Sequence, residues 1–228
     1  MKIDIKELFK KHDIEINDSQ ITKLEKYYEV LVDWNSKINL TAITDYEDVL
    51  KKHFLDSIYL IKHFDFNNKQ LLDVGSGAGF PSLPLKIMIP SLNVTIIDAL
   101  KKRVTFLEIL TKELDLNAKL IHGRAEEFNN RNFYDFVTAR AVARLNILSE
   151  LCLPFVKVGG LFLPLKGPKY EEELEESLKG IKILGGKYIH TINFQIDDNS
   201  RSVLKIEKVS NTNKLYPRQF GKIKSKPL

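Results

Sequence analysis

The stretch that most constrains the fold of this chain is residues 71–81. An apolar run ends there at Asp73, and three glycines follow at alternate positions, 75, 77 and 79. Pro81 then opens an amphipathic segment. This order predicts a strand, a tight turn and a helix, because glycine tolerates positive φ and the start of a helix offers unpaired N–H groups. We therefore expect a turn that binds a nucleotide.

The charges around this turn indicate which nucleotide it binds. The third glycine comes one position too early for the dinucleotide pattern G-x-G-x-x-G, because Phe80 occupies the place of the last glycine. Asp73 would repel a pyrophosphate but favour a ligand with an ammonium and a sulfonium. Asp98 ends the next apolar run, 23 residues after Gly75, where a carboxylate can accept both ribose hydroxyls. We expect S-adenosylmethionine as the cofactor; the alternative is a glycine-rich turn without a ligand.

Strand and helix patterns alternate from residue 69 onward, which predicts a mainly parallel sheet with right-handed crossovers. The last two strands are separated only by a polar turn, so we expect them to form an antiparallel hairpin. The predicted strands are 69–74, 93–98, 118–122, 134–139, 158–165, 187–196 and 202–209. The predicted helices between them are 80–89, 101–114, 144–156 and 170–179. A seven-stranded α/β sheet of this kind is typical of class I, Rossmann-like methyltransferases.

Residues 1–65 show helical periodicity, with apolar residues spaced for helices around 8–9, 21–32 and 49–61. Thr44 with Glu47 resembles a capping box before the third of these. We expect three parts: a helical extension (1–65) packed on the core, a cofactor-binding core (66–209) and a basic tail (210–228). The tail has five basic residues and no acidic residue. It could therefore bind a polyanion such as nucleic acid, or only keep the chain soluble.

Composition excludes several classes of protein. Cys152 is the only cysteine, and it lies among leucines, where burial raises the pKa of a thiol; we expect it to pack in the core rather than to act as a nucleophile or metal ligand. The apolar runs are too short to span a membrane, and the N-terminus is too charged for a signal peptide. We expect a cytoplasmic monomer that uses neither a metal nor a membrane.

The loops that follow the third, fourth and fifth predicted strands indicate the substrate, because ligands of such sheets bind beyond the carboxyl ends of the strands. They carry Arg124, Arg144 and Lys166, which together favour an anionic substrate. No general base is apparent at these strand ends. Guanine N7 requires none, because its lone pair accepts a methyl group without loss of a proton. Binding and orientation would then provide the catalysis.

The chain resembles the RsmG (GidB) family of bacterial 16S ribosomal RNA guanine-N7 methyltransferases, from about Trp34 to its last residue. The matching motifs are Trp34-Asn35, Asn39-Leu40-Thr41, His53, Leu55-Asp56-Ser57, the glycine turn 73–81, Asp98, Lys102-Arg103, Arg124-Ala125-Glu126-Glu127, Arg140-Ala141, Gly159-Gly160, Lys166-Gly167, Tyr216-Pro217-Arg218 and Lys226-Pro227-Leu228. The Asn-Leu-Thr and Tyr-Pro-Arg motifs distinguish this family from other methyltransferases with a similar turn. The chain departs from the family pattern at Ser82, Ala99, Ala139 and Phe220.

The resemblance implies N7 methylation of a guanosine in 16S ribosomal RNA, on free RNA or on the small subunit, with no dedicated catalytic residue. With the charge argument it gives these cofactor residues: Asp73, Gly75, Gly77, Gly79, Phe80, Asp98, Ala125, Glu126 and Arg140. The residues expected to contact RNA are Asn39, Thr41, His53, Asp56, Arg144, Lys166, Tyr216 and Arg218. Two alternatives are a small-molecule methyltransferase, in which the N-terminal helices form a lid, and a non-catalytic RNA-binding module.

Overall fold

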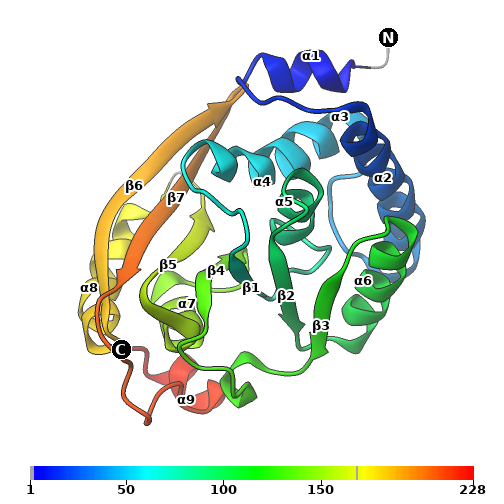
Figure 1. Ribbon diagram of the computed structural model, residues 1–228. Helices are drawn as coiled ribbons and strands as arrows, with labels where there is room; N and C mark the ends of the chain where they lie inside the picture. Colours follow the sequence, from blue (N-terminus) through cyan, green and yellow to red (C-terminus); the bar gives the residue numbers. More distant parts are fainter. Residues whose placement is uncertain (1–2, 168) are drawn as a thin grey trace.

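The computed structural model of the protein describes residues 3–167 and 169–228. Within these residues, seven strands form one sheet in the order β3-β2-β1-β4-β5-β7-β6, with helices on both faces (Figure 1). Their bounds are β1 Gln70–Val74, β2 Asn93–Asp98, β3 Ala118–His122, β4 Tyr134–Arg140, β5 Val156–Lys166, β6 Gly186–Ile196 and β7 Asn199–Lys208. The first five strands are parallel, and β7 pairs antiparallel with both β5 and β6. The predicted parallel sheet with an antiparallel C-terminal hairpin is confirmed.

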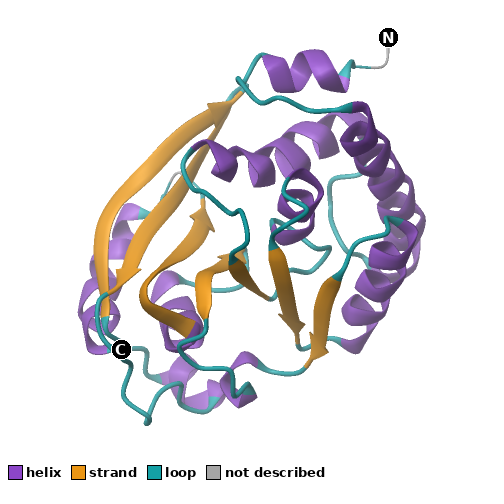
Figure 2. Cartoon of the chain, in the orientation of Figure 1, coloured by secondary structure: helices purple, strands orange, loops and turns teal. Residues whose placement is uncertain are grey.

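Helices cover the sheet on two sides (Figure 2). Each side has its own apolar core. The N-terminal helices pack with α5 and α6 on one face, and α7, α8 and the C-terminal α9 pack on the other. The bounds are α1 Ile5–Lys10, α2 Asp18–Ile38, α3 Tyr46–Val49, α4 Asp56–Ile58, α5 Ser82–Met88, α6 Lys101–Glu113, α7 Leu145–Cys152, α8 Glu171–Ile183 and α9 Phe220–Ser225. Because both faces are covered, β1 is an uninterrupted buried run rather than an alternating one.

Helix α3 of the helical extension begins at a different N-cap residue from the one predicted from the sequence. Asp45 is the N-cap of α3, and its side chain accepts a hydrogen bond from the N–H of Asp48. The predicted capping box of Thr44 with Glu47 was therefore wrong, and the Thr44 carbonyl accepts from the hydroxyl of Tyr28. The region predicted as one helix around 49–61 is divided into α3, a π-helix (η1, Leu50–Leu55), α4 and a 3-10 turn (η2, Tyr59–Lys62).

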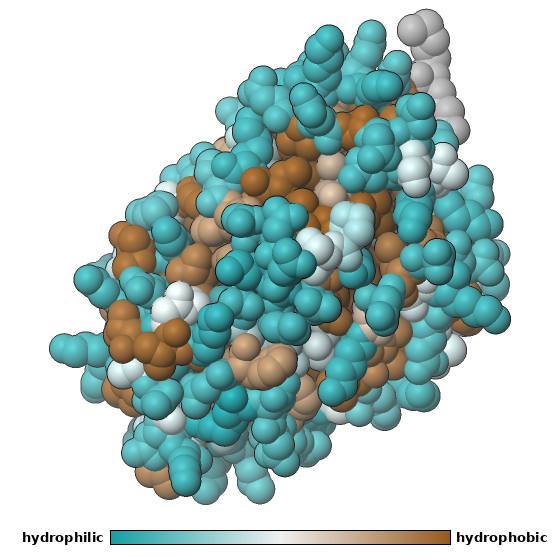
Figure 3. All heavy atoms as spheres, in the orientation of Figure 1, coloured by the Kyte–Doolittle hydropathy of each residue, from teal (hydrophilic) through white to brown (hydrophobic). Residues whose placement is uncertain are grey.

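The basic tail is packed on the core. Ile223 is fully buried on the α7 side of the sheet. The guanidinium of Arg218 donates three hydrogen bonds to the carboxylate of Glu150, which lies on α7 and is itself fully buried. Among the described residues, no helix is long and apolar enough to cross a membrane. Hydrophilic side chains cover most of the face in Figure 3, with patches of apolar side chains between them.

Candidate functional site

A cavity of about 680 Å³ opens beside the glycine turn, at the carboxyl ends of β1, β4 and β5. Both the helical extension and the core contribute its walls. Of the residues predicted from the sequence, it brings together Thr41, His53, Asp56, Gly75, Gly77, Phe80, Arg140 and Lys166. Five basic and two acidic side chains are among the described residues that line it. The cavity is therefore electropositive and suited to an anionic ligand.

The glycine turn adopts the backbone geometry for which its glycines were expected. Gly75, Gly77 and Gly79 all have positive φ, at 72°, 61° and 96°. A Cβ at Gly77 would meet no described atom within 4 Å, so this residue presents bare backbone to the cavity. A Cβ at Gly79 would lie 2.5 Å from the hydroxyl oxygen of Tyr27, so this residue faces the protein interior. The turn thus has one side for a ligand and one side for packing.

Asp73 lies beneath this turn and is fully buried. Its Oδ2 accepts a hydrogen bond of 2.6 Å from the hydroxyl of Ser82, one of the positions at which the sequence departs from the family pattern. Its Oδ1 has no hydrogen-bond partner among the described residues. Burial raises the pKa of Asp73 to about 7, and the Ser82 hydrogen bonds oppose that rise. A cation bound above the turn would favour the ionised carboxylate, so the pocket fits a ligand with an ammonium and a sulfonium.

Asp98 contacts the glycine turn, and Ala125 and Glu126 lie in the loop after β3, but none of the three is among the described residues that line the cavity. Asp98, at the end of β2, is almost fully buried, and its carboxylate accepts hydrogen bonds from the N–H groups of Gly77 and Leu100. It therefore braces the turn, and its remaining lone pairs are the ones available to a ribose. Ala125 and Glu126 form a 3-10 turn after β3 (η3, Ala125–Glu127), in the loop next to β2.

Phe80 is the centre of a cluster of aromatic and charged groups. The guanidinium carbon of Arg140 lies 4.8 Å from the centroid of its ring, and the His53 ring is stacked on it at 4.6 Å. Burial, assisted by the charge of Arg140, lowers the pKa of His53 to about 4. His53 is therefore neutral at physiological pH. Its Nε2 shares a hydrogen bond of 2.8 Å with the hydroxyl of Thr41.

Asp56 connects two arginines at the cavity. Its Oδ2 accepts a hydrogen bond of 2.9 Å from Arg140, and its Oδ1 lies 3.2 Å from the Nε of Arg201 on β7. Burial raises the pKa of Asp56, and the two guanidiniums oppose that rise. Sequence reasoning missed Arg201, because only the position of β7 next to β5 brings it to the cavity. No local pattern could have identified it.

The other residues predicted to contact RNA interact with other parts of the protein. Lys166 donates to the carboxylate of Glu173, and Arg144 donates to that of Glu176. Asn39 ends α2 in the left-handed conformation, next to Leu40 and Thr41, which line the cavity. Tyr216 and Arg218 lie in the docked tail, where the backbone carbonyl of Tyr216 accepts from Arg131. These two lie outside the cavity, although they form part of the same α7 side of the protein as Glu150.

Comparison with known proteins identifies the family. The model of the family described as "rRNA small subunit methyltransferase G" matches residues 20–203. The protein of that function from Staphylococcus carnosus (strain TM300) is 50% identical over 231 residues, which cover 97% of this chain and 96% of the relative. The corresponding protein of Lactococcus lactis subsp. lactis (strain IL1403) is 49% identical and covers 95% and 94%.

Solved structures support the fold. The crystal structure of M. jannaschii TYW2 in complex with AdoMet has a TM-score of 0.59 at 17% identity, and the match covers 74% of this chain and 80% of that one. The tRNA (m1A58) methyltransferase TrmI from Aquifex aeolicus has a TM-score of 0.54 at 15% identity, with coverages of 68% and 69%. At these identities the likeness concerns the fold, which is that of class I methyltransferases.

Proposed function

Because this chain belongs to the rRNA small subunit methyltransferase G family, and so is an S-adenosylmethionine-dependent methyltransferase of 16S ribosomal RNA, we propose that it methylates N7 of one guanosine. The observation that carries this proposal is the electropositive cavity beside a glycine turn with an open, Cβ-free face. A small-molecule methyltransferase would have no use for five basic side chains around its cavity. We further propose that the protein works as a monomer in the cytoplasm.

Each predicted residue has a place in this proposal. Gly75, Gly77 and Gly79 form the cradle, with Asp73 as the buried counter-charge below it and Asp98 for the ribose. Phe80 and Arg140 bind the cofactor from the cavity side, and Ala125 with Glu126 contacts the adenine. The residues that contact the RNA in this proposal are Asn39, Thr41, His53, Asp56, Arg144, Lys166, Tyr216 and Arg218. When bound, S-adenosylmethionine supplies an electrophilic methyl group. The residues of the chain bind the cofactor and the RNA and orient them toward each other.

N7 methylation should proceed without a general base. His53 is the imidazole at the cavity, and its pKa of about 4 leaves it neutral across the physiological range. At saturating cofactor, we expect the single-turnover rate to vary by less than about twofold between about pH 6 and 8, because the acceptor lone pair loses no proton. Single-turnover rates on purified small subunits, measured across this range, test the prediction. A rate that rises tenfold per pH unit would instead indicate a deprotonated acceptor.

The position of the methyl group can be determined directly. Small subunits are incubated with the protein and S-adenosylmethionine labelled in its methyl group, and the RNA is then treated with borohydride and aniline. Cleavage of the labelled RNA at one guanosine is the expected result, since this treatment breaks the chain at N7-methylguanosine. Parallel reactions with naked 16S RNA identify the better substrate. A further reaction offers a library of small amines and phenols in place of the RNA. Label that enters only these small molecules would contradict the proposal.

The tail should contribute electrostatically to RNA binding. Lys222, Lys224 and Lys226 are exposed, so their triple change to Gln should leave the fold intact. We expect the variant to bind RNA more weakly. We also expect the slope of log affinity against log salt concentration to fall by the equivalent of up to about three phosphate contacts. The control is the triple change of Lys10, Lys11 and Lys112, which are exposed on the other face of the sheet. Equal salt slopes for the two variants, measured by filter binding, would show that the tail does not contact RNA.

A further inference from the structure

Tyr27 connects the helical extension to the glycine turn. It lies on α2 and is fully buried. Its hydroxyl donates a hydrogen bond of 2.5 Å to the backbone carbonyl of Ala78. Ala78 stands between Gly77 and Gly79, so this bond holds the middle of the turn itself. Burial raises the pKa of Tyr27 well above its usual value, so the hydroxyl stays protonated and remains a donor.

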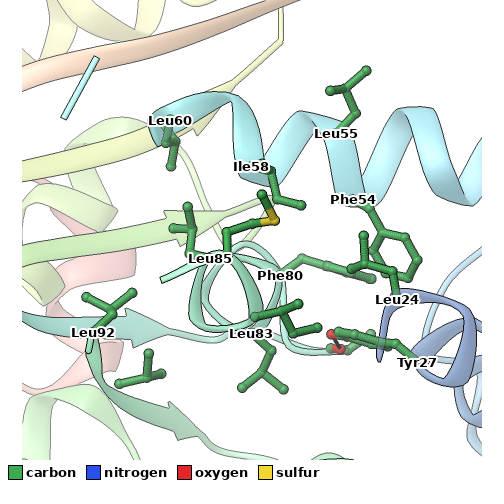
Figure 4. Packing of buried hydrophobic residues seen from close by; sticks show 14 of the residues in the cluster. Leu24, Tyr27, Phe54, Leu55, Ile58, Leu60, Phe80, Leu83, Leu85 and Leu92 are labelled. Carbon is green, nitrogen blue, oxygen red and sulfur yellow. Dashed lines mark hydrogen bonds between the residues drawn. The ribbon is translucent and has the colours of Figure 1, made fainter. Parts of the chain in front are cut away.

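The ring of Tyr27 also holds Phe80. The two rings are stacked, with centroids 5.3 Å apart and planes within 4° of each other. Phe54 packs against both at 5.1 and 5.9 Å (Figure 4). Arg140 and His53, which line the cavity, contact this same Phe80 ring. A single side chain of the extension thus fixes a turn carbonyl and an aromatic ring at the cavity wall.

The fit between Tyr27 and the turn is close. The hydroxyl oxygen lies 2.5 Å from the point that a Cβ at Gly79 would occupy, so the bond to Ala78 requires glycine at that position. Without the Tyr27 hydroxyl, the carbonyl of Ala78 would be left without this hydrogen-bond donor, which is energetically unfavourable for a buried group. The turn would then be free to leave the geometry in which Gly77 faces the cavity.

We propose that Tyr27 is a positioning residue for cofactor binding, and that the helical extension is in this way a part of the cofactor site. The inference rests on the proposed function only in that the glycine turn is the cradle for S-adenosylmethionine. It extends that function, because no motif of the turn or of the sheet includes this tyrosine. The extension therefore acts on the cofactor as well as on the RNA.

The test is the Tyr27→Phe variant, which keeps the stacked ring and removes only the hydroxyl. We expect the Kd for S-adenosylmethionine to rise by up to about tenfold, the full value of one buried hydrogen bond, because the relaxed turn must be ordered again when the cofactor binds. The KM for the cofactor should rise with it. The KM for small subunits and the kcat at saturating cofactor should stay within about twofold of the wild type. Calorimetry for binding and steady-state methylation for kinetics provide these values.

Tyr28→Phe is the matched control. Its hydroxyl donates to the Thr44 carbonyl at 3.1 Å, away from the turn, so its loss should leave the cofactor Kd unchanged. Equal cofactor Kd values for the two variants would overturn the proposal, even if Tyr27→Phe alone lowers the melting temperature. A change in the KM for small subunits without a change in cofactor Kd would overturn it as well. Failure of the wild-type protein to bind S-adenosylmethionine would instead contradict the proposed function.

Discussion

Replacing Gly79 with alanine is expected to destabilise the protein by about 3 kcal/mol and to abolish cofactor binding. The residue has a φ of 96°, which costs a side chain of the L configuration about 1 to 2 kcal/mol. The new methyl group would also lie 2.5 Å from the Tyr27 hydroxyl and 2.8 Å from Leu83, and such overpacking adds about 1 to 3 kcal/mol. Urea unfolding monitored by circular dichroism measures the loss of stability.

Gly77→Ala separates folding from binding. It has positive φ too, but no described atom lies within 4 Å of its Cβ position. We expect a loss of only about 1 to 2 kcal/mol in the free energy of unfolding, from the backbone alone. Its methyl group would point into the cavity, so cofactor binding should be lost although the fold survives. Equal stability of the two variants would show that Gly79 is not packed as described.

Replacing Arg218 with alanine should destabilise the fold by about 3 kcal/mol, because it leaves the carboxylate of Glu150 buried without its charged partner. The backbone N–H of residue 218 also donates to Glu150 and remains in the variant, so part of the compensation survives. Differential scanning calorimetry measures the expected fall in melting temperature. A second change, Glu150→Gln, removes the buried charge and should restore part of the loss.

Arg144→Ala is the control for this prediction. Arg144 forms an ion pair with Glu176 at a similar distance, 2.7 Å, but both side chains are about half exposed to solvent. Exposed pairs contribute little to stability, so we expect no measurable change in melting temperature. If Arg218→Ala were as stable as Arg144→Ala, the contact with Glu150 would not hold the tail.

The fold could be predicted from the sequence because its signals are local. Alternation of strand and helix patterns depends on residues a few positions apart, and the glycine turn fixes where the central strand ends. The observed strands begin and end within three residues of the predicted ones; the largest difference is at β7, which starts at Asn199 rather than 202. The hairpin turn proved tighter than its polar residues indicated.

The site could be predicted only where it follows a motif. The family resemblance implied that Asp56 lies at the pocket and contacts RNA, and it does line the cavity. In the structure its carboxylate pairs with Arg140 and Arg201. Tyr27 and Arg201 belong to no motif of the turn, and each reaches the site only through the packing of a distant element. Tertiary placement of this kind leaves no pattern in a single sequence.

The place of β7 between β5 and β6 has a consequence for the synthesis of the chain. β6 is made before β7, yet it joins the sheet only through β7. Until residues 199–208 have left the ribosome, β5 remains an open edge, which is the kind of surface on which nascent chains aggregate. The sheet can therefore close only after β7 has been made, and the edge of β5 stays exposed until then. Arg218, which neutralises the buried carboxylate of Glu150, is synthesised later still.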